Sequence, residues 1–145
     1  MTPETMFLIC NNGVLPAWLL LALAPHWRGT QVIVHAIWIP GLLGLAYLWA
    51  MLSGGPPVAD GGFGSLAGVM ALLSTPHAAL AGWIHYLAFD LFVGAWESRD
   101  ARRLGISPWL VLPCLFLTLM AGPVGLLLYG ILRLSLRKTA TLQEA

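Results

Sequence analysis

Four long apolar segments dominate the sequence, and they restrict it to one class of fold. A transmembrane helix needs about 20 consecutive, mostly apolar residues. The chain is 59% hydrophobic and only 9% charged, whereas an ordinary soluble domain has roughly one quarter charged residues. The sequence therefore predicts an all-α fold, an integral membrane bundle of four transmembrane helices in one domain. The predicted spans lie at about residues 5–24, 31–52, 77–96 and 108–132.

Local signals mark several helix ends. Thr75-Pro76 and Ser107-Pro108 each place a capping hydroxyl before a proline at the first helical position. Gly105 is suited to end the third helix, which we expect to continue to about Leu104 and to project into water. Proline within a helix leaves a backbone carbonyl without its hydrogen bond, so the prolines within the spans predict kinks. Neighbouring groups can satisfy these carbonyls in a membrane. These prolines are Pro16, Pro40, Pro113 and Pro123.

The segments outside the spans leave several alternatives open. Residues 53–65 form a Gly- and Pro-rich linker. Residues 66–73 are apolar but too short to span, so they lie at the interface, re-enter the membrane or extend the third helix. The N-terminal segment is predicted to be a retained helix and not a signal peptide, because Glu4 is the only charge before His26.

Charge around the spans determines the orientation poorly. The run 97–103 is predicted to be a solvated helix end, with a local pair between Asp100 and Arg103. With four crossings, Arg28 and the arginines of 97–103 share one side, which gives four basic residues. The opposite side holds the three basic residues of 133–138. This distribution barely favours cytoplasmic loops with both termini outside.

Asp90 is the most informative single residue, because it lies inside the third apolar segment. A carboxylate at bilayer depth costs several kcal/mol unless it is paired, neutralised or turned inward, so it marks a functional site by default. The alternative is a buried acid that only fixes helix packing. His85 lies five residues earlier and diverges from Asp90 by about 140° around the helix, so the two do not share a face.

Depth along the helices sorts the other polar residues into two tiers. Asn11 and Asn12 are expected near the level of His85, and His35 near that of Asp90. His35 and His85 are then about 12 Å apart along the membrane normal, which argues against two axial haem ligands. No metal-binding motif is visible in the sequence, and the net charge of +1 gives no reason to expect nucleic acid. We therefore expect no cofactor and no metal.

A longer pattern resembles a known family. It begins with Gly82-Trp83-Ile84-His85-Tyr86-Leu87-Ala88-Phe89-Asp90-Leu91-Phe92-Val93-Gly94 and continues through Arg99-Asp100, Arg103, Gly105-Ile106, Pro113-Cys114-Leu115, Leu117-Thr118 and Gly122-Pro123-Val124-Gly125. This pattern resembles the abscisic-acid-deficient-four-like family of small membrane proteins of plants and bacteria. Its plant member is associated with neoxanthin formation from violaxanthin. The resemblance is close from about residue 83 to residue 133 and looser before.

The resemblance implies an apolar isoprenoid or carotenoid-like ligand in the bilayer, and an isomerisation by acid–base chemistry. A carboxyl group held away from water tends to stay protonated and can donate a proton. Asp90 is therefore the predicted acid, and His85 or His35 the predicted base. The predicted substrate-binding residues are Asn11, Asn12, Trp83 and Trp38.

Three function classes stay open at this point. The first is the isomerase or carotenoid-binding protein, expected in a bacterial inner membrane and possible as a homo-oligomer. The second is a non-catalytic scaffold or pigment-handling subunit that supports another enzyme. The third is a small transporter or a quinone or haem module. The few intramembrane charges disfavour transport, and the different depths of His35 and His85 disfavour haem.

Overall fold

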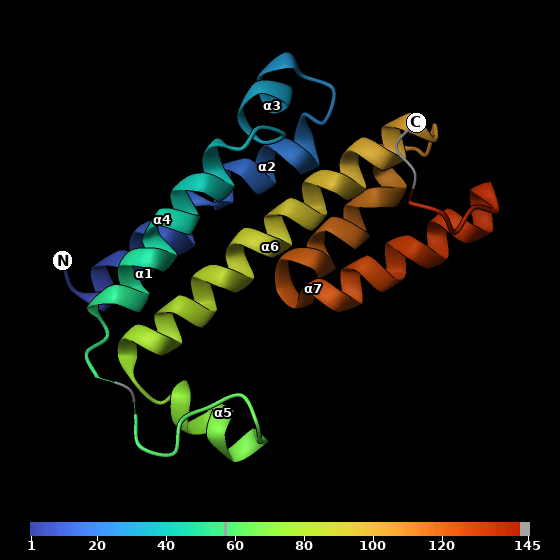
Figure 1. Cartoon of the computed structure of the whole chain (residues 1–145). Helices are drawn as coiled ribbons and strands as arrows, with labels where there is room; N and C mark the ends of the chain where they lie inside the picture. Colours follow the sequence, from blue (N-terminus) through green and yellow to red (C-terminus); the bar gives the residue numbers. More distant parts are fainter. Residues whose placement is uncertain (57, 143–145) are drawn as a thin grey trace.

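The computed structural model describes residues 1–56 and 58–142, and it is built from helices (Figure 1). No strand occurs among the described residues, so the all-α class is confirmed. Four helical stretches are long and apolar enough to cross a membrane. They are Pro3–Leu23, Arg28–Ser53, Pro76–Arg103 and Pro108–Arg137.

The first two stretches are each interrupted close to a proline. Helices α1 (Pro3–Gly13) and α2 (Leu15–Leu23) meet at Val14, two residues before Pro16. Helices α3 (Arg28–Ile33) and α4 (Trp38–Ser53) are separated by a short non-helical segment just before Pro40. Proline lacks the backbone N–H that would continue the helical ladder, so a break at these points is expected.

Helix α6 (Pro76–Arg103) is the central element, and α1, α2, α4 and α7 all pack against it. Its first turn is capped by the Thr75 hydroxyl, which accepts a hydrogen bond from the Ala78 N–H at 3.3 Å. Its end is set by Gly105, whose φ of +65° favours glycine. The predicted end of the third helix is thus confirmed.

Helix α5 (Leu66–Leu72) is a separate short helix between α4 and α6. Ser65 caps it by accepting a hydrogen bond from the Gly68 N–H at 3.0 Å. It follows the Gly- and Pro-rich linker and lies beside the beginning of α6 (Figure 1). Of the alternatives for this segment, an extension of α6 is therefore wrong.

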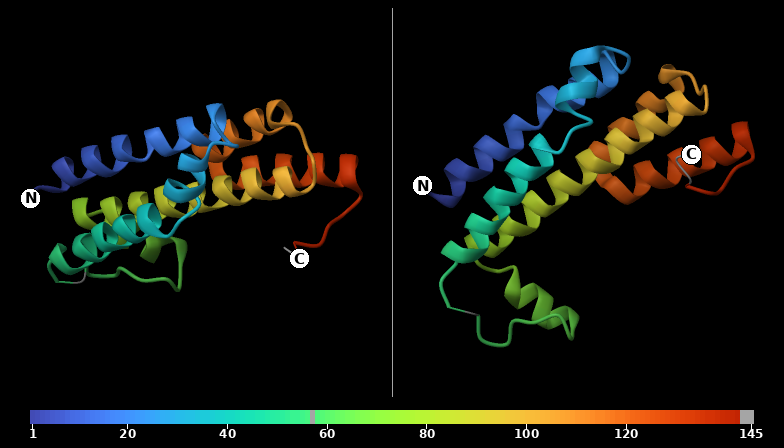
Figure 2. Two further views of the ribbon diagram at one scale, coloured as in Figure 1. Left: turned by 90° about the horizontal axis from the view of Figure 1, so that it is seen from above. Right: turned by 45° about the horizontal axis from the view of Figure 1, so that its top comes forward.

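Helix α7 (Pro108–Arg137) does not run straight, because it turns back on itself at Ala121. A straight helix of 30 residues would hold its ends about 45 Å apart. Instead Arg137, the last residue of α7, donates a hydrogen bond to the carbonyl of Gly105, which precedes α7. Figure 2 shows the two halves of α7 lying side by side against α6. The sequence predicts kinks at Pro113 and Pro123, and the structure instead has a complete reversal at Ala121, beside Pro123.

Two glycines allow the two halves of α7 to approach each other and α6. Ala121 has non-helical angles (φ −157°, ψ 65°), and Pro123 follows it. A Cβ atom on Gly125 would collide with the backbone of Thr118, and one on Gly122 would collide with the Asp90 carboxylate. The turn of the α7 hairpin therefore depends on the absence of side chains at these two positions.

We predict that Gly125→Ala will destabilise the protein while Gly130→Ala will not. Overpacking costs about 1–3 kcal/mol, because the backbone must shift to accommodate the methyl group. Gly130 lies on the same half of α7 and has open space at its Cβ position, which makes it the matched control. Thermal unfolding of the detergent-solubilised protein measures the difference. Equal midpoints for the two variants would contradict the tight turn.

Candidate functional site

A groove between α4 and α6 contains the predicted site residue His85. It has a volume of about 460 Å³ and is lined by His85, Tyr47 and otherwise apolar side chains. The ring of His85 stacks on Phe89 with centroids 4.4 Å apart and lies 6.3 Å from the ring of Tyr47. His85 is thus an ionisable group in an apolar groove. The remaining lining residues are Pro40, Leu43, Gly44, Ile84, Ala88 and Phe92.

A smaller hollow adjoins the groove toward the end of α6. This hollow, of about 160 Å³, shares Pro40 and Phe92 with the groove and is lined at its far end by His35 and Arg99. The Arg99 guanidinium lies 3.3 Å from His35 Nδ1. We call the two hollows together the α4–α6 groove. His85 and Arg99 are 14 positions apart, which sets their spacing along α6 at about 21 Å.

Asp90 lies on a different face of α6, against the turn of the α7 hairpin. Its carboxylate touches Gly122, and its Oδ2 atom is buried without a hydrogen-bond partner among the described residues. One turn earlier, the Tyr86 hydroxyl donates a hydrogen bond to the Leu119 carbonyl at 2.7 Å. The structure therefore does not bring Asp90 and His85 together, in agreement with their spacing along the helix.

The depths expected for the polar residues are confirmed only in part. Asn11 Oδ1 accepts a hydrogen bond from Trp83 Nε1 at 3.1 Å, so the level expected for Asn11 is confirmed. His35, however, lies beside Arg99 and not at the level of Asp90, because the non-helical segment before α4 displaces it toward the end of α6. The structure therefore places His35 beside Arg99, nine residues after Asp90 on α6, and not at the depth that the sequence predicts.

The remaining predicted substrate-binding residues lie outside the α4–α6 groove. Trp83 lines a separate crevice of about 580 Å³ between α1 and α6, together with Phe7. Asn12 donates to the Leu8 carbonyl of its own helix at 2.9 Å. Trp38 is 67% exposed at the beginning of α4 and does not line the groove.

A buried polar cluster between α6 and α7 was not predicted. Glu97 is fully buried, and both its carboxylate oxygens accept from the Thr118 hydroxyl, at 3.0 and 3.1 Å. Asp100 is 2% exposed, and it forms ion pairs with Arg133 and Arg103, each at 2.7 Å. The expectation of a solvated helix end is wrong here, although the local Asp100–Arg103 pair is confirmed. The hairpin of α7 covers these acids.

The sequence contains an indication of this cluster, but the spacing of the residues alone does not identify their partner. Tyr129 and Arg133 are four residues apart, so they share one face of a helix in an otherwise apolar stretch. Both donate to Asp100 Oδ2 at 2.7 Å. Only the reversal of α7 brings them to Asp100, and a straight helix would have carried them to the opposite side of the membrane.

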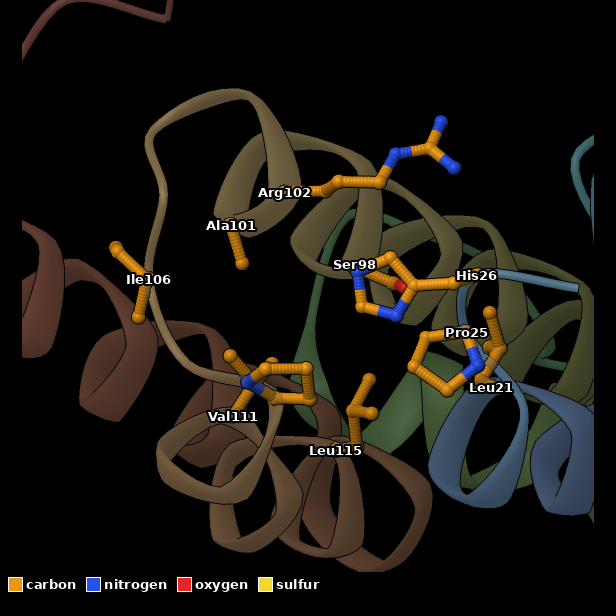
Figure 3. A pocket seen from close by; sticks show the side chains of 10 residues that line it. Leu21, Pro25, His26, Ser98, Ala101, Arg102, Ile106, Val111 and Leu115 are labelled. Carbon is orange, nitrogen blue, oxygen red and sulfur yellow. The ribbon is translucent and has the colours of Figure 1, made fainter.

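A small crevice between α2, α6 and α7 contains three further polar residues. Figure 3 shows the side chains of His26, Ser98 and Arg102 around it, with Ile106 to the left and Val111 and Leu115 below. Its volume is about 20 Å³, which is room for a water molecule and not for an elongated ligand. Among the described residues, no group of three or more His, Cys, Asp and Glu side chains could hold a metal ion.

The comparison with known proteins identifies the family. The profile of the family described as ABA DEFICIENT 4-like matches residues 5–129. The chain belongs to the ABA DEFICIENT 4-like family. No curated protein and no solved structure gives a significant match. The matched region covers the α4–α6 groove, the Asp90 contact and both buried acids, and it ends four residues before Arg133.

We predict that Arg133→Met will destabilise the protein strongly. Removing one partner of a buried ion pair leaves the other charge poorly compensated, at a cost of about 3 kcal/mol. Lys138→Met, five residues later at an exposed position and without a side-chain hydrogen bond among the described residues, is the control and should change stability by about 0.5 kcal/mol or less. Thermal unfolding in detergent compares them. If the cluster is the cause, adding Asp100→Asn to Arg133→Met should recover part of the loss.

Proposed function

We propose that this member of the ABA DEFICIENT 4-like family binds an elongated isoprenoid or carotenoid-like lipid in the α4–α6 groove and isomerises it by proton transfer at His85. The observation that carries the proposal is a pair of adjoining hollows that share Pro40 and Phe92, the larger one apolar and lined by His85, the smaller one lined by His35 and Arg99. The membrane of residence is expected to be a bacterial plasma membrane.

The shape and lining of the groove support an apolar, chain-like ligand. Most lining side chains are aliphatic or aromatic, and Phe89 and Phe92 on its edge are 59% and 56% exposed. Because helix surfaces in a membrane face acyl chains, a ligand dissolved in the bilayer can enter from the side without crossing water. A spacing of about 21 Å between His85 and Arg99 matches a ligand of several isoprene units better than a compact one.

The chemistry requires no redox cofactor. In the conversion of an epoxy end group to an allenic alcohol, the adjacent chain carbon loses a proton and the ring C–O bond breaks. The released oxygen then gains a proton, so atoms and electrons balance within the substrate. The neutral ring of His85 can take the proton from carbon and return it to oxygen, because it both accepts and donates. The Tyr47 hydroxyl in the same groove is the nearest second donor.

Asp90 takes a different role in this proposal from the acid inferred from the sequence. Its carboxylate lies against Gly122 and outside the groove lining. There it faces the beginning of the second half of α7, where the backbone N–H groups of a helix favour negative charge. We therefore propose that Asp90 positions the α7 turn, while His85 contacts the ligand.

Binding without conversion is the alternative function, and one observation favours it. The main part of the groove contains His85 as its one ionisable side chain besides Tyr47. A pigment-handling subunit needs such an apolar groove but no proton transfer. The following experiment separates the two functions.

We predict that expression of the protein in a carotenoid-producing host changes the pigment profile, and that Gly44→Phe abolishes the change. Gly44 lines the groove with open space at its Cβ, so a phenyl ring there fills the ligand volume. Gly41 also has open space but does not line the groove, so Gly41→Phe is the matched control. Chromatography of extracted pigments, at equal membrane abundance, measures the outcome.

His85→Gln distinguishes catalysis from binding in the same host. If His85 transfers the proton, the variant should retain co-purifying pigment but lose at least about tenfold in product, as expected for loss of a general acid–base group. An unchanged profile in every background, with pigment bound to the wild-type protein, would support binding alone. A colourless protein with no effect on pigments would refute both forms of the proposal.

A further inference from the structure

The positive charge of this protein is concentrated at one end of the bundle. The sequence contains seven lysines and arginines. Four of them, Arg28 and three between residues 99 and 103, belong to the end where α2 leads into α3 and where α6 stops. The hydrogen bond from Arg102 Nη2 to Gln31 Oε1, at 2.9 Å, joins these two regions.

The α7 hairpin brings the other three basic residues to the same end. Arg133 is bound to Asp100 at 2.7 Å, and Arg137 is bound to the Gly105 carbonyl at 2.5 Å. Lys138 follows directly after α7. All seven basic residues therefore lie at one end, where a straight α7 would have divided them four to three. Five of them are exposed: Arg28, Arg102, Arg103, Arg137 and Lys138.

The opposite end of the bundle has a different character. It holds the N-terminus, the linker before α5 and the beginning of α6 (Figure 1). Its charged side chains include Glu4 and Asp60, which are acidic and exposed. The two ends therefore differ in the sign of their charge.

The depth of the α7 hairpin fits a segment that enters the bilayer without crossing it. Its first half, residues 108–120, is about 20 Å long, against a hydrocarbon core of about 30 Å. Side chains near the turn are apolar and exposed, with Phe116 at 63% and Met120 at 56%. Both polar ends of α7 meet the end of α6, and the turn lies farther along α6, beside Asp90.

We propose that the basic end is the cytoplasmic end, that it binds the anionic phospholipid headgroups of that leaflet, and that α7 is a re-entrant hairpin. The chain then crosses the membrane three times, with its N-terminus outside and its C-terminus in the cytoplasm. Basic residues close to transmembrane segments are retained on the cytoplasmic side, where anionic lipids attract them. The inference is independent of the proposed function, because it uses neither the α4–α6 groove nor His85.

Cysteine labelling in oriented membranes tests the topology. Cys10 and Cys114 are both buried and are first replaced by alanine. Ala59→Cys, in the linker before α5, and Ala140→Cys, after α7, then place single thiols at exposed positions. A membrane-impermeant maleimide should label position 59 only from outside and position 140 only from the cytoplasm. Met120→Cys, at the hairpin turn, should stay unlabelled from both sides.

Each labelling result decides one part of the proposal. Labelling of positions 59 and 140 from the same side would mean that α7 crosses the membrane, and would overturn the hairpin. Labelling from opposite sides but in the reverse sense would overturn the cytoplasmic assignment of the basic end.

Lipid binding tests the partner. Native mass spectrometry compares the retention of phosphatidylglycerol and phosphatidylcholine by the purified full chain. Arg28→Gln combined with Lys138→Gln removes two exposed charges without a side-chain hydrogen bond among the described residues, and should weaken phosphatidylglycerol binding roughly tenfold. Glu4→Gln with Asp60→Asn, at the other end, should have no such effect. Equal loss in both double variants, or no preference for phosphatidylglycerol in the wild type, would overturn the proposed partner.

Discussion

The carboxylate of Asp100 is the contact on which the arrangement of this protein depends. Tyr129 and Arg133 of α7 and Arg103 of α6 all donate to it. In a low-dielectric environment these interactions are stronger than in water. For the same reason, a buried polar group without its partner costs more free energy there. The second half of α7 is therefore held against α6, because its separation would break the hydrogen bonds from Tyr129 and Arg133 to Asp100. The C-terminal residues take part as well, since Arg133 also donates to the carbonyls of Thr139 and Thr141.

Much of the rest follows from this contact. The first half of α7 places Thr118 over Glu97, and the turn at Ala121, which the Asp100 contacts hold closed, places Gly122 over Asp90. All three acids of α6 thus face the hairpin, while His85 faces α4 on the other side of the same helix. The polar interior and the apolar groove are separated by α6 itself. This separation explains why Asp90 and His85, only five residues apart in the sequence, belong to different parts of the structure.

The sequence was sufficient for the class of fold, the length of the apolar segments and the ends of α6, because these depend on hydropathy and on local capping by Thr75 and Gly105. It was not sufficient for the course of α7. Pro113 and Pro123 both lie within that stretch, yet the helix reverses only beside Pro123, where Gly122 and Gly125 permit close contact. The run at residues 97–103 was misjudged for the same reason, since its burial depends on a partner distant in sequence. The face of α6 that carries His85 could be derived from helical spacing, but the groove opposite it could not.

The lateral opening of the α4–α6 groove has a consequence for how any occupant would reach it. A ligand that enters between Phe89 and Phe92 comes from the acyl chains and not from the aqueous phase. Occupancy would then follow the mole fraction of the ligand within the bilayer, and dilution of a cell suspension would leave it unchanged. Lipid composition, by setting how much of the compound dissolves per unit area, would control saturation.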